Sequence, residues 1–129
     1  MTFDSLTFMF SIINNASLSN QSDVFIPTSK KNLRILMVLY KEGVIRGFII
    51  NKKKIKVQIK YTTGGVIKPV IKNIKMISTN GRLIFVSVKV LSKLAHHNEI
   101  LIISTNKGIL SAKEALQLNV GGIVLAKIF

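Results

Sequence analysis

Apolar residues recur at helical spacing in two stretches of the first third of the chain. The first stretch, residues 6–16, predicts a helix followed by a polar loop, and residues 24–26 predict a short strand. A second helix is predicted from residue 33 to residue 42, because hydroxyl residues precede this apolar run and Gly43 follows it. One face of this second helix is expected to lie in the core. Its residues are Leu33, Leu36, Met37 and Tyr40.

Alternating apolar and polar residues mark the clearest hairpin of the chain. Residues 47–50 form its first arm, Asn51 to Lys54 form the turn, and residues 55–61 form the second arm. Strict alternation indicates that one face of the second arm is buried and the other is solvated. The solvated face is expected to be cationic, because it carries Lys56 and Lys60.

The stretch after this hairpin is the expected seam between two parts of the protein. Residues 66–78 mix isoleucine with lysine, and Pro69 confines any strand there to the edge of a sheet. We therefore predict an α+β fold with two small α/β subdomains, residues 1–68 and residues 69–129. The N-terminal one is a helix-strand-helix-hairpin, and the C-terminal one is a mostly antiparallel sheet with a short capped helix.

The C-terminal end of the chain predicts a strand, a polar loop, a capped helix, a glycine turn and a strand. The apolar residues 100–103 lead into residues 104–108, which offer two hydroxyls, a carboxamide, an ammonium and a glycine. A capping-box pattern at residues 111–114 starts a helix that ends near residue 118, where Asn119 suits a left-handed cap. Residues 123–129 read as a closing strand. The polar loop is then the exposed tip of a rigid frame.

The middle of the C-terminal part is less regular. Asn80-Gly81 is a strong hairpin-turn signal, and a strand is expected over residues 83–88. Residues 91–98 predict one irregular helical turn. His96 and His97 are metal candidates in principle, but adjacent helical residues do not face each other and no third ligand is evident.

Composition and charge narrow the class of protein. With 129 residues, 48% of them hydrophobic, and only two prolines, the chain can bury a sizeable core. Against this, 19 Lys and Arg face 5 Asp and Glu, for a formal net charge of +14. A small folded protein of this kind is most simply a binder of polyanions, either nucleic acid or an anionic membrane surface. The alternative is a soluble protein whose lysine-rich surface has no binding role.

Several classes of protein are disfavoured by what the sequence lacks. The absence of cysteine excludes disulfides and thiolate metal sites. The longest uncharged stretch, residues 5–22, has too short an apolar run to span a membrane, and residues 1–29 hold no Lys or Arg, unlike an import signal. A membrane-surface role is disfavoured because no strongly amphipathic, lysine-rich helix is present. Catalysis is disfavoured too, because five scattered acids and two histidines supply no convergent site, and no cofactor is expected.

Several motifs together resemble the small-subunit ribosomal protein S8 family. Residues 104–108, the short helix after them and Val120-Gly121-Gly122 are similar to that family's C-terminal signature. Residues 26–30 and 39–45 resemble the entry and exit of its second helix. Shorter matches are Lys60-Tyr61 and Gly81 with Phe85. The resemblance covers nearly the whole chain.

The chain departs from the family pattern in four places. Asn106 replaces a usual serine, Ile123 replaces a glutamate, Ile12 to Asn15 replace a segment with two arginines, and His96 to Glu99 replace Gly-Leu-Gly. Only three of the 19 basic residues are arginine, while Ile, Asn, Lys and Phe are abundant, which suggests an AT-rich genome. These features predict a divergent, organellar member in the mitochondrial matrix. A plastid or a bacterial cytoplasm is the alternative location.

The resemblance implies a structural constituent of the small ribosomal subunit. Such a protein binds a helical junction in the central domain of small-subunit ribosomal RNA and supports assembly and translation. Its partners are that RNA and neighbouring small-subunit ribosomal proteins, with no membrane and no small-molecule substrate. The alternatives are a repressor that binds messenger RNA and a small basic RNA-processing enzyme, for which the nearest candidate pair is His97 with Glu99.

The expected RNA contacts fall into three groups. Short donors and acceptors suit the shallow minor groove of RNA, glycines permit close approach of the backbone, and lysines attract phosphates whatever the sequence. The alternative for the two hydroxyls of the polar loop is that they only satisfy local backbone groups. The candidate residues are Ser104, Thr105, Asn106, Lys107, Gly108, Gly121, Gly122, Phe85, Lys30, Lys31, Lys52, Lys53 and Lys54.

Overall fold

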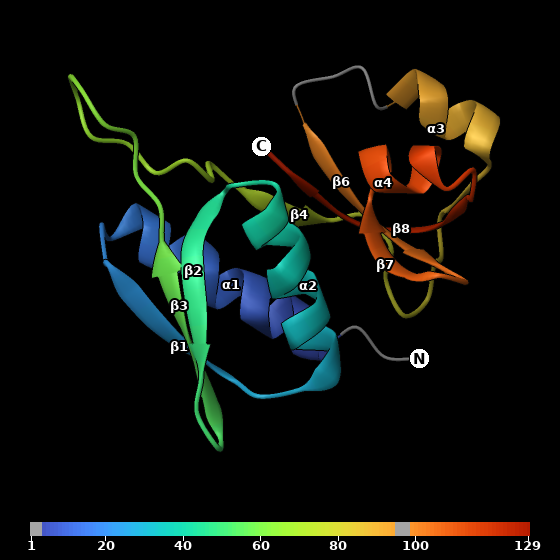
Figure 1. The fold of residues 1–129 in the computed structure, drawn as a ribbon. Helices are drawn as coiled ribbons and strands as arrows, with labels where there is room; N and C mark the ends of the chain where they lie inside the picture. The colour runs from blue at the N-terminus through green and yellow to red at the C-terminus, as the bar shows by residue number, and fades with distance from the viewer. Residues whose placement is uncertain (1–3, 95–98) are drawn as a thin grey trace. The chain divides into compact units, whose positions relative to one another are not determined.

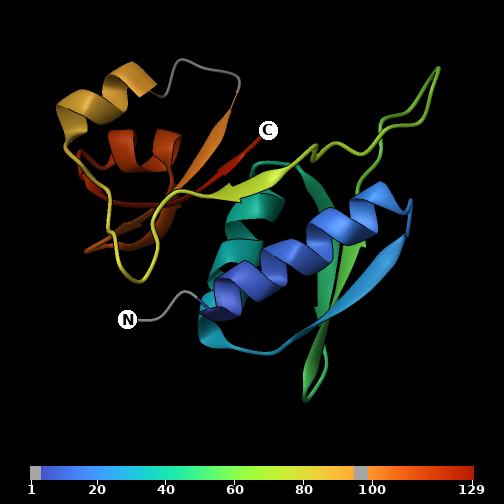
Figure 2. The ribbon, with the colours of Figure 1, turned by 180° about the vertical axis from the view of Figure 1, so that it is seen from behind.

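The structure, a computed structural model, describes residues 4–94 and 99–129. Its contacts divide the described chain into two compact units, which meet in sequence between Asn73 and Ile74. The first unit contains two helices and a three-stranded sheet, and the second contains two helices and a five-stranded sheet (Figures 1 and 2). The α+β class predicted from the sequence is confirmed.

The first unit follows the predicted order of helix, strand, helix and hairpin. Its elements are α1 (Asp4–Leu18), β1 (Asp23–Pro27), α2 (Lys30–Lys41), β2 (Ile45–Ile50) and β3 (Lys54–Ile59). The sheet is antiparallel in the order β1-β3-β2. Both helices contact the sheet, and α1 packs on β3, which buries Ile55, Val57 and Ile59. Alternation along β3 therefore predicted the buried face correctly.

Hydrogen bonds at their ends fix the lengths of α1 and α2. The side chain of Ser29 caps α2 by accepting a hydrogen bond from the backbone N–H of Asn32 at 3.1 Å. After the end of α2 at Lys41, the φ of +75° at Gly43 permits the left-handed turn, and Asn20 (φ +57°) plays the same part after the end of α1 at Leu18. The ammonium of Lys60 donates to the Gly43 carbonyl oxygen at 2.8 Å.

The expected core face of α2 is only partly right. Leu36 is fully buried, but Met37 and Tyr40 are more than half exposed. The sheet contacts an arc of the helix that is rotated away from these two residues, and the ring of Tyr40 instead meets Phe48 edge-to-face, with ring centroids 6.4 Å apart. The buried residues of α2 are Asn32, Ile35, Leu36, Val38 and Leu39.

The second unit is built around a central strand, β8. Its elements are β4 (Ile74–Met76), β5 (Phe85–Val86), α3 (Val88–Leu94), β6 (Ile100–Thr105), β7 (Gly108–Ser111), α4 (Ala112–Gln117) and β8 (Gly122–Ile128). The antiparallel order is β4-β8-β6-β7, and β5 also pairs with β8. Residues of α3 and α4 pack on one face of this sheet. That core cluster consists of Leu91, Leu101, Ile103, Ala112, Ala115 and Val124.

The predicted strand over residues 83–88 is too long. Only the two residues of β5 are paired, and Val88 already begins α3, because burial of Leu91 in the core favours a helix there. The remaining part of the predicted helical turn lies outside the described residues, as do the metal candidates His96 and His97.

The turn predicted at Asn80-Gly81 is confirmed. Thr79 and Arg82 exchange two backbone hydrogen bonds across it, of 2.8 and 3.1 Å. The turn does not pair β4 with β5, since both strands pair with β8. Ser78 anchors the turn: it is completely buried, and its hydroxyl donates to the carbonyl oxygen of Val124 on β8.

Candidate nucleic-acid interface

The polar motif near the C-terminus is a tight hairpin. Ser104 and Thr105 are the last residues of β6, Gly108 is the first of β7, and only Asn106-Lys107 form the turn. The expected polar loop of residues 104–108 is therefore shorter than predicted, while the helix after it begins at the predicted cap, Ser111. The pairing of Thr105 with Gly108 extends both strands, and the four residues of β7 precede α4.

The two hydroxyls of this hairpin differ in their surroundings. The hydroxyl of Thr105 donates to the carbonyl oxygen of Gly108 at 2.8 Å and accepts from the N–H of Lys107 at 3.1 Å. The hydroxyl of Ser104 makes no hydrogen bond within the described part of the chain. Asn106 and Lys107 are exposed. Thr105 thus stabilises the turn, while Ser104, Asn106 and Lys107 keep polar groups available.

The sheet brings Phe85 next to this hairpin. Phe85 pairs with Ile123 on β8, Ile123 pairs with Ser104 on β6, and Ser104 pairs with Ile109 on β7. Directly opposed residues of antiparallel strands point to the same face. Since the neighbouring Ile103 lies in the core cluster, this row lies on the face away from that core. Phe85 is 69% exposed there.

Gly108, Gly121 and Gly122 are required by the structure for different reasons. A Cβ atom on Gly122 would collide with the carbonyl oxygen of Ser104, and one on Gly121 with that of Val86. These two glycines therefore allow neighbouring strands of the protein itself to approach closely. Gly108 has open space around it, but its φ of +112° is a backbone conformation that favours glycine.

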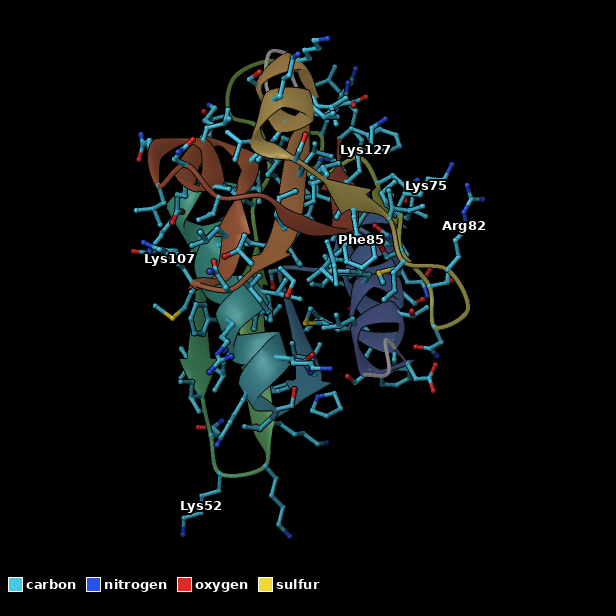
Figure 3. The ribbon with its side chains drawn as sticks, turned by 90° about the vertical axis from the view of Figure 1, so that its right-hand side faces the viewer. Lys52, Lys75, Arg82, Phe85, Lys107 and Lys127 are labelled. Atoms are coloured by element: carbon cyan, nitrogen blue, oxygen red, sulfur yellow. The ribbon has the colours of Figure 1, made fainter. Side chains whose placement is uncertain are left out.

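The second unit carries exposed cations on β4 and at two of its turns. Lys107 is exposed at the β6–β7 turn, and Figure 3 shows the side chains of Lys75 and Arg82 extending outward from β4 and from the turn before β5. Lys127 lies opposite Lys75 in the sheet, and its ammonium pairs with the carboxylate of Glu99 at 2.9 Å. The ion pair neutralises one member of a like-charged cross-strand pair, which leaves Lys75 and Arg82 to attract anions.

The lysines predicted in the first unit are mostly free at its surface. Lys52, Lys53 and Lys54 are exposed at the β2–β3 turn, where Lys52 projects from the tip (Figure 3), and none has an ion pair among the described residues. Lys30 is also exposed at the start of α2. Lys31 is half-buried and already interacts within the protein. The hairpin tip and Lys30 are thus the accessible cations of this set.

The expected cationic face of β3 is used internally. Lys56 pairs with the carboxylate of Asp23 at 3.4 Å, and Lys60 donates to the backbone at the end of α2. Both side chains are half-buried rather than freely solvated. The hydroxyl of Tyr61, after β3, donates to the carbonyl oxygen of Gln21, and burial raises the pKa of Tyr61, so the donor stays protonated at neutral pH.

Three other features would point to a different function: a metal site, a membrane-spanning helix or the candidate nuclease pair. No group of three or more metal-ligating side chains is present in residues 4–94 and 99–129. Across the same residues, no helix is both long enough and apolar enough to cross a membrane. The histidine of the candidate nuclease pair, His97, lies outside the described residues.

Comparison with known proteins gives a consistent picture over both units. A family model described as ribosomal protein S8 matches residues 4–129. The small ribosomal subunit protein uS8 of Orientia tsutsugamushi is 40% identical over 131 residues, covering 98% of this chain and 97% of its own. Those of Brucella anthropi (39% over 126 residues; 94% and 93%) and Nitrobacter hamburgensis (36% over 133 residues; 99% and 98%) are similar to the chain as well.

Proposed function

Because the chain belongs to the ribosomal protein S8 family, it is a structural, non-catalytic protein of the small ribosomal subunit, and we propose that it binds a helical junction in the central domain of the ribosomal RNA. One observation carries the proposal for the site. The sheet places Phe85 and Ser104 in one row on the face away from the core of the second unit, and the exposed Asn106-Lys107 turn lies at the end of the strand that carries Ser104.

Each of these groups suits a different part of an RNA junction. The free hydroxyl of Ser104 and the carboxamide of Asn106 can bond ribose hydroxyls and base edges in a shallow minor groove. The exposed ring of Phe85 can stack on a base that the junction leaves unpaired. Lys107 extends from the turn to phosphate. Thr105 holds the turn in shape rather than contacting RNA.

The lysines supply attraction that does not depend on RNA sequence. Lys52 to Lys54 at the hairpin tip and Lys30 at the start of α2 are exposed cations in a chain with a formal charge of +14. We assign specific recognition to the C-terminal subdomain, residues 69–129, and general phosphate attraction mainly to the N-terminal subdomain, residues 1–68. Neutralising the hairpin tip should then weaken all RNA binding alike.

The location we propose is the ribosome of a mitochondrion. The scarcity of arginine and the abundance of Ile, Asn, Lys and Phe support an AT-rich organelle genome, and the bacterial relatives fit an organelle ribosome of bacterial type. Fractionation of source cells tests this proposal. Co-sedimentation of the protein with small subunits from purified mitochondria is expected, whereas its recovery only with plastid or cytoplasmic ribosomes would contradict the location.

A pair of aromatic variants tests the RNA site. Phe85→Ala should weaken binding to the cognate junction by about 1–3 kcal/mol, the value of one base–aromatic stack. Phe25→Ala removes a similarly exposed ring from the first unit and should leave the affinity unchanged. Affinities are measured by filter binding on the junction and on a plain duplex of equal length. Equal losses for the two variants, or an undiminished affinity of Phe85→Ala, would exclude this placement of the site.

A further inference from the structure

The first unit carries a groove that the proposed RNA contacts do not use. It lies beside the edge strand β2, between that strand and the exposed side of α2. We name it the β2-edge groove. Its side chains are Met37, Tyr40, Lys41, Arg46, Phe48 and Gln58.

The backbone of β2 opens this groove. The register of β2 on β3 shifts between Ile45 and Gly47, so Arg46 is the extra residue of a bulge, a device that re-aims a side chain at a sheet edge. Gly47 lines the groove without a side chain. A Cβ atom there would lie 3.1 Å from the Oε1 atom of Gln58, closer than ordinary contact. Beyond the bulge, the outer edge of β2 is not paired with another strand among the described residues.

The walls of the groove are apolar and exposed. Met37 is 51% exposed and Tyr40 is 56% exposed, although both belong to a helix that otherwise buries its apolar side chains well. Ile50 does not line the groove, but it lies on the same face of β2 as Phe48 and is 57% exposed. The edge-to-face contact of Tyr40 with Phe48 holds the two rings at 89° and stiffens the wall. Exposed apolar side chains gathered in this way mark an interaction site.

Cations border these apolar walls. Lys41 and Arg46 line the groove, and neither makes an ion pair within the described residues. An occupant that brings a carboxylate to them would gain complementary charge.

We propose that the β2-edge groove binds an extended segment of a neighbouring small-subunit protein that carries a carboxylate beside apolar side chains. The inference rests on the proposed function, because it supposes that the protein sits in a small subunit. The apolar side chains of the segment pack between Met37, Tyr40 and Phe48, its carboxylate meets Arg46 and Lys41, and its backbone can pair with the free edge of β2.

The composition of the groove favours protein over RNA as its occupant. Of the lining residues, Tyr40, Phe48, Met37 and Arg46 are of types enriched in protein–protein interfaces, whereas Lys41 is of a type depleted there. The lysine cluster of this unit lies instead at the hairpin tip, Lys52 to Lys54. The side chains of Met37 and Phe48 offer no conventional hydrogen-bond donor or acceptor for a base edge or a ribose hydroxyl.

Site-specific crosslinking in assembled subunits tests the proposal. A photo-crosslinking amino acid replaces Met37 in the full chain or, as a control, Val66, which is also exposed in this unit but lies outside the groove. Small subunits containing each protein are isolated and irradiated, and the products are identified by mass spectrometry. Each chain is also prepared with Arg46→Glu or with the matched control Arg34→Glu, an exposed arginine of α2 outside the groove.

The expected result is a crosslink from position 37 to an Asp- or Glu-bearing segment of one neighbouring ribosomal protein. Arg46→Glu should reduce its yield at least about tenfold, since it opposes like charges, while Arg34→Glu should leave the yield unchanged. Crosslinks to RNA, to a second copy of the chain or to nothing would overturn the proposal, as would equal losses with the two arginine variants. Absence of the protein from small subunits would instead overturn the proposed function, and this inference with it.

Discussion

Replacing Gly122 by alanine should destabilise the second unit through a steric clash inside the sheet. The new Cβ atom would overlap the carbonyl oxygen of Ser104 and lie 3.0 Å from its carbonyl carbon and 3.2 Å from the Cα of Thr105. All three atoms are backbone of β6, so none can rotate away as a flexible side chain would. Overpacking of this kind costs about 1–3 kcal/mol, offset by about 0.4–1 kcal/mol from the reduced freedom of the unfolded chain.

Two other glycines provide matched controls. Apart from Gly81 and its two chain neighbours, no described residue has an atom within 4 Å of the position that a Cβ would take at Gly81, and its φ is not left-handed. Gly81→Ala should therefore change the free energy of unfolding by less than about 0.5 kcal/mol. Gly108 also has open space, but its φ is +112°. Gly108→Ala should therefore cost about 1–3 kcal/mol through backbone strain alone. Comparing the three variants separates steric contact from strain.

The assay is thermal and urea unfolding of the purified variants, followed by far-ultraviolet circular dichroism because the chain lacks tryptophan. A chain of this size should lose about 4 °C in Tm per kcal/mol, so Gly122→Ala should melt clearly below Gly81→Ala. If these two variants melt together, β8 does not lie as close to β6 as the structure places it. The steric reason given for Gly122 would then be refuted.

Three further predictions concern the hydroxyls and the lysines. Thr105→Ala should lower the free energy of unfolding by about 1–3 kcal/mol, because two hydrogen bonds of the turn are lost. Ser104→Ala should leave the Tm unchanged and weaken only binding to the cognate junction. The opposite pattern would mean that Ser104 stabilises the turn and Thr105 contacts the RNA. Replacing Lys52, Lys53 and Lys54 together by Gln should weaken binding to cognate and unrelated RNA alike. The slope of the logarithm of the binding constant against the logarithm of the salt concentration should become shallower by about 2–3, measured by filter binding between about 50 and 200 mM salt. A loss of affinity confined to the cognate junction would contradict this prediction. Ser78→Ala should cost about 1–3 kcal/mol in urea unfolding, because it leaves the buried carbonyl of Val124 unpaired, and an unchanged midpoint would count against that hydrogen bond.

Local signals in the sequence were sufficient for most helix ends and for the first hairpin. The hydroxyl of Ser29, the glycine at residue 43 and the asparagine at residue 119 act within a few residues of their own backbone, so their roles are visible without the fold. Asn119 has a φ of +57° and ends α4 as predicted. The alternation along β3 is equally local, because successive side chains of a strand point to opposite faces.

The parts that escaped prediction depend on distant neighbours. β7 has only four residues and no alternation, and it is recognisable only through its pairing with β6. The burial of α2 depends on where the sheet lies, which periodicity alone does not specify, so Met37 and Tyr40 were misplaced. In the candidate site, the resemblance pointed to Phe85 and to the polar hairpin separately. Their meeting across β8, and the reason for Gly122, required the strand order.

The central position of β8 also has a consequence for how the chain folds during its own synthesis. Within the described residues, β4 and β5 pair with no strand other than β8, and β8 follows both of them and β6 in chain order. The nascent second unit therefore exposes unpaired strand edges until β8 has left the translating ribosome, while the first unit already has all its strands. Domains generally fold as units, with the N-terminal one first. A chaperone that protects this protein should accordingly engage the stretch between β4 and β6, and release it when β8 inserts.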